Sequence, residues 1–331
     1  MVMKMREVTF EEYLRFIEKS NIIRIEDQEI SLEPIHVERL EPYGEELTDI
    51  SSTVWSFPKR GSWATHRGDY RGNWAPQIPR ALMLMYTRPG EVVLDPMIGS
   101  GTTAIEAKLL GRNCIAVDIN YQAVMLTLHR LYWLEKALEQ LNRGTLEQFM
   151  GISRQSIEYD DMKKAWVKVY HGDARNLDEI DDGSVDLIAT HPPYFNIIEY
   201  SGRKPAEGDL SKARSLEEYL KWMSDIAEEL YRVLKPGRYC AILIGDTRIH
   251  GHYVPISHHV LDVFLNAGFI LKEEVIKIQH KMKTTRELWK KLGRKNFLLI
   301  YHEKLFIFRK PKSRVDIAKY RYSMRLDLGK D

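Results

Sequence analysis

The pattern between residues 90 and 118 constrains the fold more than any other part of the chain. The segment GEVVLDPMIGSGTTAIEAKLLG combines an apolar run that ends at Asp95, a glycine-containing turn and a helical pattern. The next segment, NCIAVDIN, is a second short apolar run and ends in an acid at Asp118. This order of strand, loop, helix and strand predicts a β-α-β unit, in which the two strands are parallel.

Apolar runs and helical patterns continue to alternate along the rest of the chain. Strands are predicted at 166–170, 185–189, 239–245, 269–279 and 297–310, and helices at 122–149, 215–234 and 256–268. This alternation predicts an α/β fold with a mainly parallel sheet that helices cover on both faces. No obvious crossover connects the last two strands, which indicates an antiparallel pair at the edge of the sheet.

Composition places the chain among ordinary globular proteins. With 331 residues, 44% hydrophobic content and a net charge of +2, it can bury a large core and stay soluble. No run approaches the about 18 to 20 apolar residues of a membrane span, and the first residues do not resemble a signal peptide. We therefore expect a cytoplasmic location and no membrane partner. Cys114 and Cys240 lie in apolar runs and are predicted to be reduced and buried, and the spacing of potential ligands suggests no metal site.

The charges are distributed unevenly. Residues 1–50 are rich in Glu, whereas the segment KMKTTRELWKKLGRK and the tail from Arg309 onward are basic. We expect an acidic N-terminal extension over 1–54, a main domain over 55–310 with a basic insertion near 280–296, and a basic C-terminal tail over 311–331. The basic segments indicate an acidic partner.

The residues that directly follow each predicted strand are the first candidates for a ligand site, because parallel α/β sheets bind ligands at the carboxyl ends of their strands. Gly99 and Gly101 let the backbone turn tightly and approach a ligand, and the hydroxyl side chains around them can cap the following helix. Asp118 is placed to accept hydrogen bonds from a ribose diol. The same loop also fits nicotinamide binding or simple turn chemistry.

Two motifs together resemble a known family. DPMIGSGTT and THPPYF, the latter at residues 190–195, look like motifs of the amino-methyltransferases, S-adenosylmethionine enzymes that methylate exocyclic amino groups of adenine or cytosine in nucleic acids. The likeness runs from about Trp55 to Lys310 and includes the ending HEKLFIFRK. The resemblance implies a Rossmann-like class I methyltransferase fold, with a seven-stranded, mostly parallel sheet and an antiparallel edge strand.

The resemblance also implies a set of residues that bind S-adenosylmethionine. The glycine loop, in which Met97 replaces the usual aromatic residue, should hold the methionine part of the cofactor. The segment GNWAPQIP should close over its carboxylate, and Asp173 in HGDARNL should contact its adenine. The candidate cofactor-binding residues are Asn73, Trp74, Asp95, Pro96, Met97, Gly99, Ser100, Gly101, Thr102, Thr103, Asp118, Asp173 and Ala174.

The HPPY tetrapeptide supplies the candidate catalytic residues. An exocyclic amine is a poor nucleophile because its lone pair is delocalised into the ring, so an enzyme must orient it. In the family, the first side chain, here His191, and a proline carbonyl, of Pro192 or Pro193, accept the two amino hydrogens. Proline fixes φ and has no competing N–H. Tyr194 should stack on a base flipped from its helix, and Phe195 should extend that surface. The alternative is a rigid strand terminator in a degenerate enzyme.

His191 departs from the family, which mostly places Asp, Asn or Ser at this position. A neutral imidazole can accept one amino hydrogen, whereas a protonated one can only donate. We therefore expect activity to fall below the pKa of the imidazole. Adenine enzymes favour Asp here and cytosine enzymes favour Ser, so the missing acid favours N4 of cytosine as the target.

Several basic and aromatic residues are candidates for binding nucleic acid. Arg286, Lys290 and Arg294 recur every four residues, which would align them on one helix face that suits phosphates or is simply solvated. The candidate nucleic-acid-binding residues are Phe195, Arg203, Lys204, Arg286, Lys290 and Arg294, and Lys212 and Arg214 lie in the same loop as Arg203. The aromatic segment 55–63 fits either the core or a platform for bases, with the core preferred.

The polymer is inferred from an absence. DNA enzymes of this family generally carry a separate recognition domain, and the sequence has no such block, which favours RNA, ribosomal RNA in particular, because RNA offers unpaired bases. DNA modification at N4 of cytosine or N6 of adenine stays open. A methyltransferase for protein glutamine, whose related tetrapeptide begins with Asn, and a non-catalytic nucleic-acid-binding protein are the alternatives from other classes. The sequence does not indicate an oligomeric state.

Overall fold

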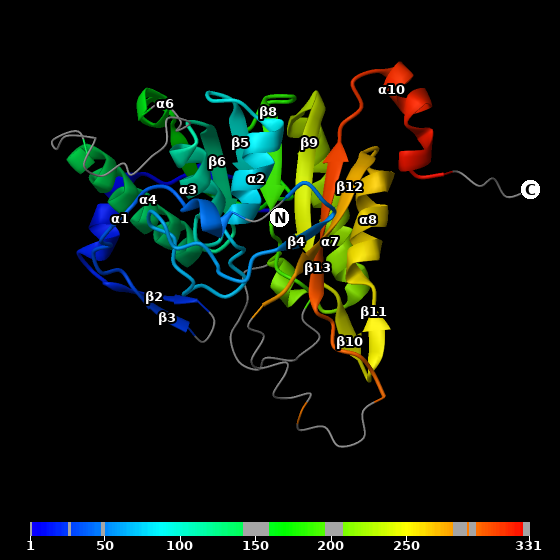
Figure 1. The fold of residues 1–331 in the computed structure, drawn as a ribbon, viewed down its shortest axis with the longest axis horizontal. Helices are drawn as coiled ribbons and strands as arrows, with labels where there is room; N and C mark the ends of the chain where they lie inside the picture. Colours follow the sequence, from blue (N-terminus) through cyan, green and yellow to red (C-terminus); the bar gives the residue numbers. More distant parts are fainter. Residues whose placement is uncertain are drawn as a thin grey trace, which may run out of the picture.

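A computed structural model describes residues 2–25, 28–47, 50–141, 159–195, 208–280, 290 and 296–326. Its centre is a nine-stranded sheet in the order β1-β7-β6-β5-β8-β9-β13-β12-β4 (Figure 1). The strands are β1 (Arg6–Glu7), β4 (Val54–Ser56), β5 (Val92–Asp95), β6 (Asn113–Asp118), β7 (Val167–His171), β8 (Val185–Thr190), β9 (Leu234–Ile244), β12 (Ile270–Ile278) and β13 (His302–Arg309). β7, β6, β5, β8 and β9 are parallel to one another, whereas β13 is antiparallel to both β9 and β12.

The predicted fold class is confirmed, with two corrections. The sheet has nine strands rather than seven, because the N-terminal segment adds β1 beside β7 and β4 beside β12. The last two strands do form an antiparallel pair, but β13 lies inside the sheet and not at its edge. It begins only at His302, so residues 297–301 of the predicted strand are not part of it. Residues 303–308 are all buried. A strand whose two faces are both apolar is most stable in the interior of a sheet, with a strand on each side and helices on each face.

Helices cover both faces of the sheet (Figure 1). Successive strand residues alternate between two buried clusters: Val93 packs with α2 (Gln77–Tyr86), α3 (Thr102–Leu109) and α4 (Tyr121–Leu141), and Leu94 with α7 (Leu216–Val233) and α8 (Ile256–Asn266). The shorter elements are α1 (Phe10–Ile17), β2 (Ile22–Ile25), β3 (Gln28–Ser31), α6 (Tyr159–Lys164), β10 (Thr247–Ile249), β11 (His252–Val254), α10 (Arg314–Lys319) and three 3-10 turns (Gly44–Glu46, Leu210–Lys212, Arg321–Ser323).

The N-terminal segment, for which an acidic extension is proposed, packs on the main domain. Tyr13 of α1 is fully buried, and its hydroxyl lies 2.7 Å from Nδ1 of His129 in α4. Together with β1 and β4, this contact ties residues 6–56 to two edges and one face of the central sheet.

The core contains the residues that the sequence assigned to it. Cys114 and Cys240 are buried in β6 and β9 as free thiols, as predicted. Trp55, Phe57 and Trp63 are at most 6% exposed, so the preferred interpretation of that segment as core is confirmed. Among the described helices, none is long and apolar enough to span a bilayer. In the described ranges, no three His, Cys, Asp or Glu side chains converge to hold a metal ion.

Candidate active site

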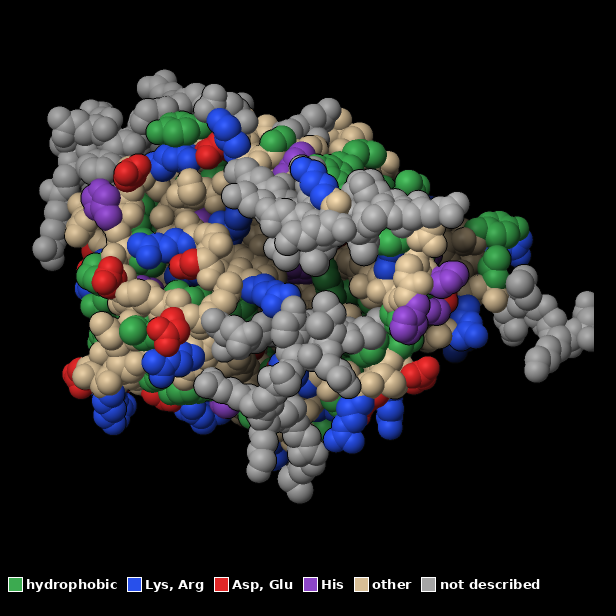
Figure 2. Space-filling view, turned by 90° about the horizontal axis from the view of Figure 1, so that it is seen from below, with side chains coloured by type: hydrophobic (Ala, Val, Ile, Leu, Met, Phe, Trp, Pro, Cys, Tyr) green, Lys and Arg blue, Asp and Glu red, His purple; other side chains and the backbone are tan. Residues whose placement is uncertain are grey.

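A cavity of about 1390 Å³ opens at the carboxyl ends of the parallel strands. Its walls come from the segments that follow β5, β6, β8 and β9, together with residues 70–74 and 208–212. Figure 2 looks onto this edge and shows a hollow near the centre of the face with Lys and Arg side chains beside it. The predicted site residues that line the cavity are Asn73, Trp74, Asp95, Pro96, Met97, Gly99, Ser100, Thr102, Asp118, Asp173, Ala174 and residues 191–195. Gly101 and Thr103 do not line it.

Asp95 ends β5 and ties the glycine loop to two neighbouring elements. Its carboxylate accepts hydrogen bonds from the hydroxyls of Thr103 in α3 (2.5 Å) and Thr190 in β8 (2.8 Å), and from the backbone N–H of Met97 (3.2 Å). Burial raises the pKa of Asp95 to about 6, and these donors oppose the rise. Asp95 is therefore an internal anchor of the loop, and Thr103 supports that anchor.

The two glycines of the loop are required by conformation and by space. Gly99 and Gly101 have φ angles of +56° and +86°, in the left-handed region that favours glycine. A β-carbon at Gly99 would lie 3.0 Å from the ring of Tyr70, and one at Gly101 would lie 3.2 Å from the side chain of Thr127. The loop can follow this path only if both positions lack a side chain.

Helix α4 holds the glycine loop from behind. The hydroxyl of Thr127 donates to the carbonyl of Gly99 (3.0 Å), and the guanidinium of Arg130 donates to the carbonyl of Ser100 (2.9 Å). Arg130 is fully buried and also pairs with Asp69, which precedes the segment 70–74 at the cavity. One turn of α4 thus fixes two carbonyls of the loop.

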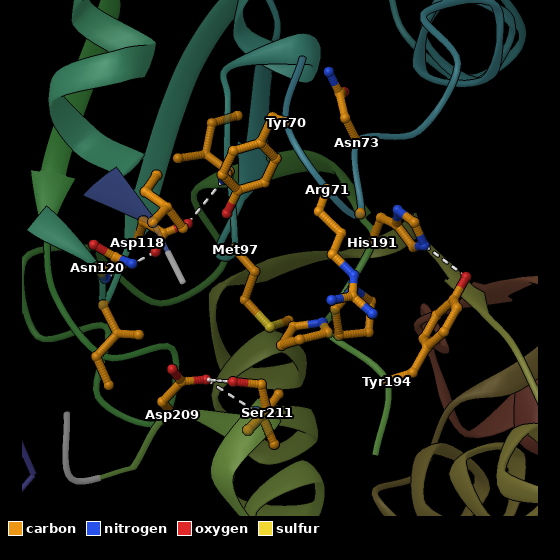
Figure 3. Close-up of a pocket in the computed structure, with 18 of the residues that line it drawn as sticks. Tyr70, Arg71, Asn73, Met97, Asp118, Asn120, His191, Tyr194, Asp209 and Ser211 are labelled. Atoms are coloured by element: carbon orange, nitrogen blue, oxygen red, sulfur yellow. Dashed lines mark hydrogen bonds between the residues drawn. The ribbon is translucent and has the colours of Figure 1, made fainter. Parts of the chain in front are cut away.

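Asp118 ends β6 and faces the cavity (Figure 3). Its two oxygens accept backbone N–H groups from Gly99 (2.8 Å) and Asn120 (2.8 Å). Burial raises the pKa of Asp118 to about 7, against the effect of these two donors, and the nearby Asp209 and Asp95 raise it further. Because each oxygen accepts one backbone donor, each keeps acceptor capacity for a ligand hydroxyl.

Asp173 lines the cavity but is engaged with a neighbour. Arg175 donates to its two oxygens from Nη2 (2.6 Å) and Nε (3.1 Å), and its backbone N–H donates at 2.9 Å. Both oxygens are therefore occupied in a pairing that the sequence did not indicate. The adenine contact assigned to Asp173 stays a prediction.

Asn73 and Trp74 bring the segment before α2 to the cavity. The side-chain amide of Asn73 donates to the carbonyl of Arg67 (2.9 Å), and its oxygen accepts the hydroxyl of Thr102. The indole of Trp74 stacks on the imidazole of His191, with ring centroids 5.9 Å apart and an interplanar angle of 21°. The candidate cofactor segment and the HPPY motif are thus in direct contact.

Hydrogen bonds connect the HPPY motif, which follows β8, to strands β13 and β12. Nε2 of His191 lies 2.6 Å from the hydroxyl of Tyr194 (Figure 3). That hydroxyl donates to Oε1 of Glu303 in β13 at 2.5 Å. Lys277 of β12 donates to the other oxygen of Glu303 at 2.8 Å. Burial lowers the pKa of His191 to about 4, although the charge of Glu303 opposes this, so the imidazole is neutral near pH 7. Nδ1 of His191 is buried and has no hydrogen-bond partner in the described part of the chain.

The two prolines and Phe195 differ in their surroundings. The carbonyl of Pro193 accepts the hydroxyl of Tyr219 at 3.2 Å, whereas no hydrogen bond within the described ranges reaches the carbonyl of Pro192. Within these ranges, the carbonyl of Pro192 therefore has both lone pairs free, whereas that of Pro193 keeps one. Phe195 is 8% exposed and its ring packs 5.8 Å from that of Tyr219, so it belongs largely to the core behind the cavity wall.

Sequence reasoning missed several residues at this cavity and behind its wall. Glu303 and Lys277 lie on strands far from both motifs, and no local signal distinguishes them from ordinary strand charges. Gly245 is also required, since a β-carbon there would lie 2.7 Å from the ring of Tyr194. The additional polar residues of the wall are Arg24, Gln28, Glu29, Tyr70, Arg71, Asn120, Tyr121, His171, Asp209, Ser211, Asp246 and Thr247. Lys212, which the sequence placed beside the pocket, does line it.

Most of the predicted nucleic-acid contacts cannot be placed. Arg203, Lys204, Arg286 and Arg294 lie outside the described residues. Lys290 is described as an exposed helical residue and does not line the cavity. The expected basic helix face therefore stays a prediction.

Fold and cavity together define a class of protein. Seven central strands with β13 reversed, helices on both faces and a glycine loop at the carboxyl ends make a Rossmann-like class I methyltransferase fold. The chain belongs to the N6/N4 methyltransferase family, whose model, described as DNA methylase, matches residues 8–128 and 185–327. A second model, described as RMKL-like, methyltransferase domain, matches residues 69–243. The predicted membership of the S-adenosylmethionine-dependent amino-methyltransferases is confirmed.

Relatives of known name include enzymes with different substrates. The type II methyltransferase M.BglII of Bacillus subtilis is 34% identical over 111 residues, 33% of this chain and 28% of that protein. The tRNA (guanine(10)-N2)-dimethyltransferase of Methanocaldococcus jannaschii is 32% identical over 120 residues, 36% of this chain and 28% of that protein. Each match thus spans less than a third of the curated relative. The solved structure of TrmN from Thermus thermophilus has a TM-score of 0.40 and 20% identity over 72% of this chain and 50% of that one.

The residues of the cavity fit the family's cofactor. The hydroxyl of Ser100 is buried and has no hydrogen-bond partner in the described ranges, so a bound ligand could supply one. The backbone at Gly99 approaches the cavity without a side chain, and Asp118 keeps acceptor capacity beside it. S-adenosylmethionine has an amino-acid part, a sulfonium cation and a ribose. The hydroxyl of Ser100 and the exposed backbone at Gly99 can bind the amino-acid part, and the carboxylate of Asp118 can bind the ribose hydroxyls.

Proposed function

We propose that the protein transfers a methyl group from S-adenosylmethionine to the exocyclic amino group of a nucleobase in nucleic acid, with N4 of cytosine as the target. The observation that carries this proposal is that one cavity holds both the glycine loop with Asp118 and the HPPY motif. Methyl transfer to an amine requires a cofactor site and an amine-orienting site next to each other.

The cofactor wall supplies binding and orientation. Asp118 would hold the ribose hydroxyls, and Ser100 with the bare backbone at Gly99 would hold the methionine part. When bound, S-adenosylmethionine supplies a methyl group on a sulfonium, which an amine nitrogen can attack. The anchors Thr127 and Arg130 keep the loop in place from behind the cavity, and Asp95 holds it from within the cavity wall.

The target wall orients the amine. Nδ1 of His191 and the carbonyl of Pro192 would accept the two amino hydrogens and thereby direct the nitrogen lone pair toward the methyl group. Nδ1 could also take up the proton that the methylated nitrogen must lose. Stacking on Trp74 fixes the plane of the imidazole. Because the pKa of His191 is about 4, activity at saturating S-adenosylmethionine should begin to fall near that pH and not near 6.5.

The support for RNA and the support for DNA as the substrate come from different observations. RNA is supported by one relative, which is a tRNA methyltransferase, and by the second family model, described as RMKL-like, methyltransferase domain. The family model that covers most of the chain is described as DNA methylase, and we therefore take DNA as the first substrate and RNA as the second. Cytosine follows from the absence of an acid at His191. The cytoplasmic location expected from composition stays a prediction.

The decisive experiment is nucleoside mass spectrometry after incubation with labelled S-adenosylmethionine and, separately, unmodified DNA and unmodified ribosomal RNA. Labelled N4-methyldeoxycytidine in DNA alone supports the proposal, and labelled N4-methylcytidine in RNA alone moves the substrate to RNA. Label on N6 of adenine would overturn the choice of base.

Matched controls make a negative result interpretable. At a cofactor concentration near the wild-type Kd, Asp118→Ala should strongly reduce labelling with either polymer, and unchanged labelling would indicate a contaminating methylase. Calorimetry that finds no S-adenosylmethionine binding by the wild type would overturn the enzyme and favour a non-catalytic nucleic-acid-binding protein. Label in added protein substrate instead of nucleic acid would favour the glutamine alternative.

A further inference from the structure

A relay of hydrogen bonds runs from the HPPY motif to a buried ion pair. His191, Tyr194, Glu303 and Lys277 are linked in series by contacts of 2.6, 2.5 and 2.8 Å. The side chains of Glu303 and Lys277 are 7% and 16% exposed. The relay crosses from the segment after β8 to β13 and β12, and its last two residues do not line the cavity.

The direction of each hydrogen bond follows from the charges at the far end. The ammonium of Lys277 can only donate, and Glu303 when ionised can only accept. Burial alone would raise the pKa of Glu303, but the charge of Lys277 and the hydrogen bonds from Lys277 and Tyr194 lower it to about 2, so it is ionised near pH 7. The single hydroxyl hydrogen of Tyr194 therefore goes to Glu303.

The tautomer of His191 follows from that assignment. With its hydrogen given to Glu303, the hydroxyl oxygen of Tyr194 can only accept from His191, so Nε2 must carry the proton. A neutral imidazole has one N–H, which leaves Nδ1 as a bare acceptor. The backbone of Gly72 also faces the ring and raises the pKa of His191. Because Nε2 faces Tyr194, Gly72 favours a proton on Nδ1 and so opposes the effect of Glu303 on the tautomer. Lys277 is the other charged group that acts on the ring.

We propose that Glu303, held by Lys277, is a positioning residue that fixes His191 in the Nε2–H tautomer and so leaves Nδ1 to accept a hydrogen of the target amine. This inference deepens the proposed function and rests on it. Without the ionised Glu303, the hydroxyl of Tyr194 could donate to Nε2, and the ring proton would then lie on Nδ1. Nδ1–H and the target amine would both be donors, so the amine would have no acceptor there. Glu303 would thus act on the base through two intervening side chains and without touching it.

The test uses Glu303→Gln, a variant in which the relay should reverse. Lys277 can bind only the amide oxygen, so the amide NH2 turns toward Tyr194 and donates to its oxygen. The hydroxyl of Tyr194 must then donate to Nε2 of His191, and the ring proton moves to Nδ1. Nitrogen-15 NMR of histidine-labelled protein, with His191 assigned from a His191→Gln sample, distinguishes a protonated from an unprotonated ring nitrogen and needs no substrate.

We expect a protonated Nε2 and a bare Nδ1 in the wild type, and the opposite in Glu303→Gln. The variant should also lose about 100-fold in kcat with an unchanged KM for S-adenosylmethionine, since a misdirected group in the site costs on that order. The matched control is Glu274→Gln on β12, whose carboxylate pairs with Lys304 at 3.4 Å outside the relay. It should leave both the tautomer and kcat unchanged.

Each outcome separates the inference from the proposed function. A proton on Nδ1 in the wild type overturns the inference, even if Glu303→Gln fails to fold. If each protein has its expected tautomer but Glu303→Gln keeps the wild-type kcat, the proposed effect of Glu303 on catalysis is overturned. A wild type that methylates no nucleobase overturns the proposed function, and the spectra still decide whether Glu303 sets the tautomer.

Discussion

The two walls of the cavity are built in different ways. The glycine loop and Asp118 of the cofactor wall come from one β-α-β unit, where Asp95 and Asp118 end adjacent strands and are bonded to the loop between them. The target wall joins Tyr194 to Glu303, 109 residues further along the chain. The first wall holds carboxyl groups whose pKa burial raises, and the second holds an ionised carboxylate beside a neutral imidazole. The cofactor wall is thus built from contacts between residues close in sequence, whereas the target wall sets the position of the imidazole proton through contacts between residues far apart in sequence.

The strongest test of this division is His191→Ala, which should damage only the target wall. We expect kcat to fall by about 100- to 1000-fold, because one preorganised hydrogen-bonding group is lost. The affinity for S-adenosylmethionine should not change, since Asp118 and the glycine loop are intact. Single-turnover assays and calorimetry measure the two quantities separately. An equal loss of cofactor affinity would show that Trp74 couples the walls through its stack on His191.

Asp118→Asn is the complementary change on the cofactor wall. The amide keeps one acceptor but loses the charge, and a hydrogen bond to a charged group contributes about 1.5–3 kcal/mol, so the affinity should fall by about 10- to 100-fold. At saturating cofactor, kcat should remain near that of the wild type. Asp160→Asn, at an exposed aspartate of α6, is the control. A loss of kcat at saturation would contradict the separation of the walls.

The wild-type cofactor wall should also respond to pH. Burial, with Asp209 and Asp95 nearby, raises the pKa of Asp118 to about 7. Ribose hydroxyls donate to the ionised form, so binding should be weak below pH 7, strengthen as pH rises through 7, and release a proton. Calorimetry in buffers of different ionisation enthalpy measures that proton. The dependence should vanish in Asp118→Asn, and its persistence there would assign it to another group.

The difference between the walls also explains what the sequence could predict. The glycine loop, both strand-ending acids and HPPY are local patterns, and the structure brings them to one cavity. Glu303 and Lys277 were not found, because a charge on a strand gains its role only from the partner that the sheet order places beside it. Sheet order also explains the error about β13, since alternation of elements does not determine where a returning strand inserts. The pairing of Asp173 with Arg175 is local, yet two adjacent charges do not reveal whether they bind each other or a ligand.

The smallest expected effect is that of Thr127→Val, which removes support from behind the cofactor wall without touching the ligand. Valine has nearly the same shape, but the carbonyl of Gly99 loses the hydroxyl that donates to it at 3.0 Å. We expect a loss of about 1–2 kcal/mol in the free energy of unfolding and only a few-fold weaker cofactor binding, because a buried acceptor is left with less hydrogen bonding. Urea unfolding and calorimetry measure both, and Thr127→Ser, which keeps the hydroxyl, should restore most of the affinity. If Thr127→Val weakened binding as much as Asp118→Asn, the position of the loop and not the carboxylate would dominate binding on this wall.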